Sequence, residues 1–68
     1  MSVDEALALC DELLGKIEDL PSRAADFAES VEEKIKSIRE WIEEHDDVTD
    51  NQVRALENMG AGIDRWQR

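Results

Sequence analysis

The sequence predicts an all-α fold, an antiparallel three-helix bundle made of a helical hairpin and a third helix. Three observations predict it. Apolar residues recur at spacings of three and four in three separate segments, Pro21 separates the first two segments, and a helix-start motif opens the third. With 68 residues the chain has room for one domain, which we expect to span residues 1–68.

The first helix is expected over residues 2–20. Ser2 and Glu5 are spaced as a capping box, in which the hydroxyl and the carboxylate each bond an N–H at the helix end. Gly15 leaves a gap that a close neighbour could fill, and Leu9 falls outside the apolar stripe, where it would be exposed or contact another chain. The stripe consists of Val3, Ala6, Cys10, Leu13, Ile17 and Leu20.

The second helix is expected over residues 21–44. Pro21 ends the first helix, because the residue before a proline is pushed out of the α region, and proline is tolerated in the first turn of the next helix. This helix is longer than the first, so its uncovered end leads us to expect self-association, with a dimer favoured. Its stripe consists of Ala24, Phe27, Ala28, Val31, Ile35, Ile38, Trp41 and Ile42.

The third helix is expected over residues 49–66. Thr49 and Gln52 form a capping box, and Val48 and Val53 form a hydrophobic staple around it. The helix should continue past both glycines of this segment, because the apolar stripe continues beyond them. That stripe consists of Val53, Leu56, Met59, Ile63 and Trp66.

The charge of the chain excludes several classes of partner. It has 18 acidic and 8 basic residues, a net charge of −10, and the excess lies in residues 1–47. Direct binding to DNA, RNA or an anionic membrane is therefore not expected, because such binding depends on cationic contacts. No apolar run approaches the ~20 residues of a membrane span, so we expect a cytoplasmic protein.

The residues needed for catalysis or for a cofactor are not grouped in this sequence. One cysteine, Cys10, excludes a disulfide within the chain, and one Cys with one His is too few for structural zinc. The acidic run at residues 43–47 reads as a solvated helix end rather than a calcium loop, since it lacks the required glycine. His45 alone does not make an active site. We expect no catalytic, cofactor-binding or metal-binding residues, and no enzyme.

The candidate binding residues are acidic and aromatic. Four glutamates share the outer face of the second helix, where they are either simply solvated or imitate a row of phosphates for a nucleic-acid-handling protein. Trp66 either packs in the core, as its place on the apolar stripe indicates, or is an interface anchor, since tryptophan is enriched at binding hot spots. We expect a protein-binding accessory or inhibitory protein; a structural helical oligomer or adaptor is the alternative. The four glutamates are Glu29, Glu33, Glu40 and Glu44.

Residues 31–66 resemble the C-terminal element of small uncharacterised proteins from bacteriophages and prophages. In those proteins a tryptophan-bearing helix is followed by a Thr-x-x-Gln-x-x-Ala-Leu-x-Asn-Met helix that ends near a second tryptophan. The resemblance implies a phage accessory protein that acts on a host factor, and it assigns no functional residue. The matching residues are Trp41, Thr49, Gln52, Ala55, Leu56, Asn58, Met59 and Trp66.

Overall fold

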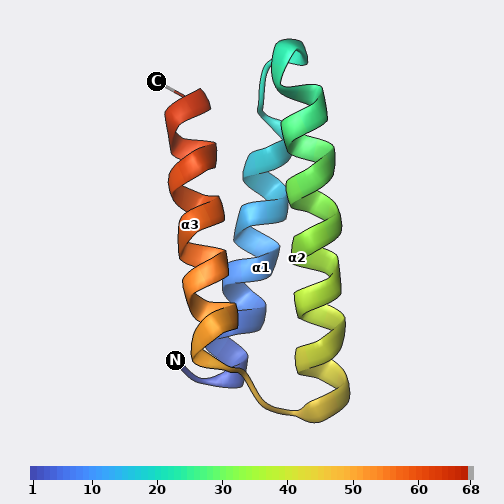
Figure 1. Cartoon of the computed structure of the whole chain (residues 1–68), viewed down its shortest axis with the longest axis vertical. Coiled ribbons are helices and arrows are strands. Elements are labelled where there is room, and N and C mark those ends of the chain that lie inside the picture. Colours follow the sequence, from blue (N-terminus) through green and yellow to red (C-terminus); the bar gives the residue numbers. More distant parts are fainter. Residues whose placement is uncertain (68) are drawn as a thin grey trace.

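Three α-helices run alternately up and down the bundle. The computed structural model describes residues 1–67, and over these residues it contains α1 (Val3–Glu18), α2 (Ala25–His45) and α3 (Asp50–Trp66), with a short 3₁₀ helix, η1 (Ser22–Ala24), before α2. α1 and α3 run in the same direction and α2 runs opposite to both (Figure 1). The expected three-helix bundle is confirmed.

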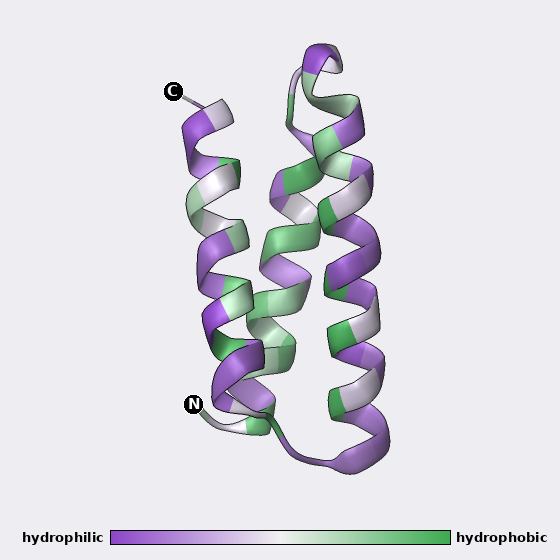
Figure 2. Ribbon diagram, viewed as in Figure 1, coloured by the Kyte–Doolittle hydropathy of each residue, from purple (hydrophilic) through white to green (hydrophobic). Residues whose placement is uncertain are grey.

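The core lies where the apolar stripes of the helices face one another. In Figure 2 the apolar residues lie mostly on the sides of the helices that face their neighbours, and the outer sides are polar. Among the described residues, no polar or charged side chain is buried. The buried apolar residues are Ala6, Cys10, Leu13, Ile17, Ala24, Val31, Ile35, Ile42, Leu56 and Ile63.

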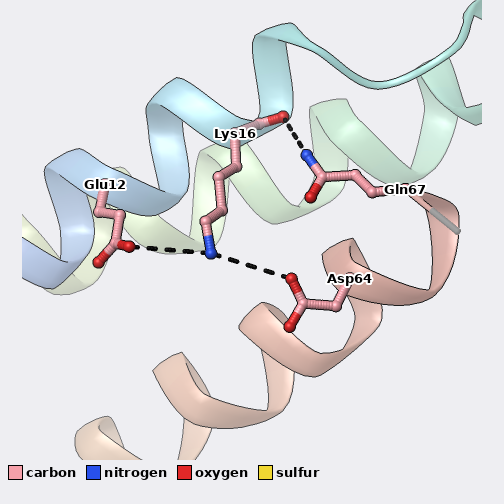
Figure 3. Close-up of polar contacts among 4 residues, drawn as sticks. All are labelled: Glu12, Lys16, Asp64 and Gln67. Atoms are coloured by element: carbon pink, nitrogen blue, oxygen red, sulfur yellow. Dashed lines mark hydrogen bonds and ion pairs between the residues drawn. The ribbon is translucent and has the colours of Figure 1, made fainter.

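α1 packs against both other helices, whereas α2 and α3 contact each other least. Arg39 Nε of α2 lies 3.3 Å from Asp11 Oδ1 of α1. On the other side of α1, Lys16 Nζ lies 3.9 Å from Asp64 Oδ1 of α3, and Gln67 Nε2 donates to the Lys16 carbonyl at 3.5 Å (Figure 3). The central position of α1 holds the bundle together.

The junction of the first two helices differs from the expected one. α1 ends at Glu18, two residues before Leu20, and α2 begins at Ala25 rather than at Pro21. Pro21 has extended backbone (φ −67°, ψ 158°), and its carbonyl accepts from Ala24 N at 2.9 Å to close the 3₁₀ turn. The helical segment thus starts directly after Pro21, as expected, but its first turn is a 3₁₀ helix, and regular α-helix begins only at Ala25.

The two predicted capping boxes have different outcomes. Thr49 Oγ1 accepts from Gln52 N at 3.1 Å, and Gln52 Oε1 accepts from Thr49 N at 2.9 Å, so this box is complete. Ser2 Oγ accepts from Glu5 N at 3.2 Å, but the return bond from the Glu5 carboxylate is absent within residues 1–67. α3 continues through both glycines to Trp66, as expected.

Two expectations about α1 are wrong. Gly15 is exposed, and a Cβ there would meet nothing within 4 Å, so no neighbour fills the gap. Leu9 is half-buried and packs against the core of its own chain. Because α1 lies against two helices, its buried face is wider than a single stripe and takes in Leu9.

Candidate protein-binding surface

α2 separates its apolar residues from a line of carboxylates. The buried residues of this helix, Val31, Ile35 and Ile42, share one side. In a helix with 3.6 residues per turn, residues four or seven positions apart lie on the same side. The four candidate glutamates have this spacing, and their side of the helix is opposite the buried residues. All four glutamates are exposed. We call this set the carboxylate row: Glu29, Glu33, Glu40 and Glu44.

Neighbouring cations of α2 pair with other carboxylates. Lys36 Nζ lies 2.8 Å from Glu32 Oε1, and Arg39 Nε lies 3.5 Å from Glu43 Oε1. Lys36 and Arg39 lie within the sequence span of the row and contact carboxylates outside it. Lys34, the third Lys or Arg of α2, takes part in no ion pair among residues 1–67. Within the described part of the chain, no carboxylate of the row takes part in an ion pair.

The structure places Trp66 apart from the carboxylate row. Its half-buried ring lies 6.2 Å from the ring of Phe27, measured between centroids, and the guanidinium carbon of Arg23 lies 5.6 Å from the Trp66 ring centroid. Phe27 and Glu29 are two residues apart on α2 and therefore face opposite sides. Trp66 thus closes the end of the bundle near η1, and it does not extend the row.

The acidic end of α2 is organised by local contacts. His45 stacks on Trp41, with ring centroids 4.1 Å apart and an interplanar angle of 12°. His45 Nδ1 lies 2.9 Å from the Trp41 carbonyl oxygen, and since a carbonyl only accepts, this nitrogen carries a proton. Asp47 Oδ1 accepts from Val48 N at 2.8 Å. Over residues 1–67 no three His, Cys, Asp or Glu side chains converge as metal ligands would.

Cys10 belongs to the core. It is fully buried, and burial raises the pKa of its thiol above the ordinary value. Of the two charges nearby, Arg39 opposes this rise in the pKa and Asp11 adds to it. The side chain therefore acts as a small apolar residue, as the sequence indicates.

A groove between α2 and α3 is a feature that the sequence analysis missed. It has a volume of about 590 Å³ and opens to solvent between α2 and α3, the pair of helices that contact each other least. In the sequence, only the spacing of its lining residues indicates that they share helix sides. Ser37 and Ile38 follow Lys34 by three and four residues, and Met59 follows Ala55 by four. The lining residues are Glu33, Lys34, Ser37, Ile38, Ala55 and Met59.

None of the protein-family models, curated proteins or solved structures compared with this chain matches it. Among the described residues, no helix combines the length and the apolar character that crossing a membrane requires. The geometry of the carboxylate row and of the groove is therefore the basis for a functional proposal.

Proposed function

We propose that this chain is a non-enzymatic protein that binds a host protein through the carboxylate row, as an accessory or inhibitory protein. One observation carries the proposal. Four exposed carboxylates lie in line along α2, and none of them has an ion-pair partner among residues 1–67, although cations lie nearby in sequence. An acidic surface left without internal partners favours a cationic surface on another molecule.

The spacing of the carboxylate row supports imitation of a nucleic-acid strand. At a rise of ~1.5 Å per residue, neighbours in the row are ~6 Å or ~10 Å apart along the helix. One DNA strand carries a phosphate every ~3.4 Å of axis, so the strand and the row both present a line of negative charges at comparable axial intervals, although the phosphates also wind around the duplex. We therefore propose that the partner is a nucleic-acid-handling protein whose basic groove accepts the row in place of phosphates.

The net charge of −10 supports the same proposal, because a field of one sign speeds the encounter with a basic partner. The resemblance of residues 31–66 to small phage proteins supports a role in acting on a host factor. The charge therefore favours a basic partner, and the resemblance favours a partner in a bacterial host.

Affinity capture from a bacterial lysate tests this function. The purified chain should capture a nucleic-acid-binding protein at low salt and release it at high salt, because screening weakens long-range attraction between charges. Excess duplex DNA should also release that protein, since both compete for one basic groove. Retention of the same protein in the presence of DNA and at high salt would contradict the mimicry.

A structural oligomer or adaptor is the second candidate, and the groove between α2 and α3 is the observation that favours it. One helix of a second copy laid along this groove would give a local four-helix arrangement with α1, α2 and α3. Analytical ultracentrifugation at several protein concentrations and two salt concentrations separates the candidates. A salt-insensitive oligomer would support the structural role, and a monomer would rule out the oligomer.

A further inference from the structure

The groove between α2 and α3 has an apolar floor and a polar wall on its α2 side. Ile38 and Met59 are half-buried and pack against the core from its outer side, and Ala55 is half-buried beside them. The exposed residues Glu33, Lys34 and Ser37 of α2 line the same space. An occupant would therefore meet apolar side chains below it and charged side chains along its α2 edge.

Glu33 links the groove to the carboxylate row. It is the member of the row that also lines the groove, so one occupant can contact both surfaces at once. Glu40 lies seven residues further along α2 on the same side of the helix. A helix lying in the groove parallel to α2 would thus pass beside two carboxylates that have no ion-pair partner among residues 1–67.

We propose that this groove binds a basic amphipathic helix of the partner protein. The inference rests on the proposed function and names the element of the partner that the surface takes. An apolar stripe at positions i, i+3, i+4 and i+7 would lie on Ile38, Ala55 and Met59. Lys or Arg side chains on the flank over α2 would reach Glu33 and Glu40, and the complex would have the packing of a four-helix bundle.

The charge of the groove favours a cationic helix over a second copy of this chain. A second copy brings another net charge of −10 and a carboxylate row of its own, so approach of the two chains is opposed by repulsion. A basic helix is attracted by the same field. Lys34 is the one cation lining the groove, and Lys34→Glu should therefore strengthen binding of the basic helix.

Two synthetic peptides of identical composition test the proposal. One has leucines at helical spacing with lysines along one flank, and the other has the same residues in an order without a stripe. Titration followed by amide chemical shifts should show the striped peptide binding at least about tenfold more tightly. Its largest shifts should fall on Ile38, Ala55 and Met59. The protein concentration is kept where sedimentation gives a monomer.

Ala55→Glu separates apolar docking from charge attraction. The change adds a negative charge but puts a charged side chain on the floor of the groove, so affinity for the striped peptide should fall about tenfold. An affinity that rises would show attraction by charge alone. Ser37→Trp is the second variant, because it fills the groove from an exposed position without a change of charge; it should also weaken binding. Thermal melts of both variants establish that they are folded.

Each outcome of the titration supports the inference or overturns it. Tighter binding of the striped peptide, with loss in both groove variants, supports it. Equal binding of the two peptides overturns it and leaves the proposed function standing, since the carboxylate row would then act by charge alone. Binding of neither peptide overturns the inference, and the capture from lysate then decides the proposed function by itself. A dimer whose groove residues are protected in the free protein overturns the inference in favour of a second copy.

Discussion

The ring of Phe27 occupies the space that a side chain at Gly62 would need. A Cβ added at Gly62 would lie 3.0 Å from Phe27 Cζ, which is too close for an ordinary contact. Phe27 cannot move freely, because its ring also lies against Trp66. The missing side chain at Gly62 thus lets α3 approach α2 at this end of the bundle, whereas the groove lies between the same two helices around Ile38 and Met59.

Alanine substitutions at Gly62 and Gly15 should separate the effect of the close contact with Phe27 from the effect of helix propensity. Gly62→Ala should lower the free energy of unfolding by about 1 kcal/mol, because overpacking forces the Phe27 ring to shift. Gly15→Ala should raise it by about 0.4–1 kcal/mol, since the site is open and alanine restricts the unfolded chain. Urea unfolding measures both variants, and a stabilised Gly62→Ala would contradict the packing described for Phe27.

The complete capping box at the start of α3 should contribute more than the half-formed one at the start of α1. Thr49→Ala removes the acceptor of the Gln52 N–H and should lower the free energy of unfolding by about 1 kcal/mol. Ser2→Ala should have a smaller effect, because the Ser2 hydroxyl accepts its bond at 3.2 Å without the reciprocal side-chain bond that holds the Thr49 box in place. Equal losses in urea unfolding would count against this difference.

Asp46 limits stability at the end of α2. It is a non-glycine residue in the left-handed region (φ 49°), and its carboxylate lies at the negative end of the helix dipole. Asp46→Asn should raise the free energy of unfolding because it removes the charge. Asp46→Gly should raise it further, to about 1 kcal/mol above that of the unchanged chain, because glycine adopts positive φ without strain. Thermal unfolding of both variants checks the order, and a destabilised Asp46→Gly would contradict it.

Cys10 should make the stability of the fold depend on alkaline pH. Its pKa is raised in the folded protein, so between the unfolded and folded pKa values the folded chain holds a proton that the unfolded chain has lost. The free energy of unfolding should therefore fall as pH rises above about 8.5. Below that pH this contribution is fully present.

Cys10→Ala provides the control for this dependence. It should lower stability at every pH, because it leaves a cavity in the core, and it should remove the part of the alkaline slope that comes from the thiol. Urea unfolding at several pH values between about 8 and about 10 measures both chains. An unchanged slope in Cys10→Ala would assign the dependence to other groups.

The sequence predicts where the helices of this fold lie along the chain better than it predicts which residues of different helices contact one another. Local signals such as the Thr49 and Gln52 pair and the stripe through Leu56 and Ile63 are carried by residues three or four apart, and the structure confirms them. Leu9 could not be placed from its own helix, because its burial depends on the two helices beside α1.

The same limit applies to the candidate surface. The carboxylate row follows from the period of a single helix, so the exposure of its members is predictable from spacing. The groove cannot be predicted from spacing, because it depends on how far α2 lies from α3 around Ile38 and Met59. Ion pairs between helices, such as Arg39 with Asp11, likewise cannot be derived from residues 28 positions apart in sequence.

The most direct test of the account compares two variants of equal net charge in the capture from lysate. In the first variant the carboxylate row is changed to glutamine; in the second, four exposed acids outside α2 and outside any ion pair in residues 1–67 are changed to their amides. These control positions are Glu5, Glu18, Asp19 and Glu57.

Quantitative mass spectrometry of the captured protein gives the answer. The account predicts that the row variant loses its partner and that the control variant retains most of it, because the partner contacts carboxylates at particular positions. Equal retention by the two variants would contradict the account, since the captured protein would then respond to net charge and not to the carboxylate row.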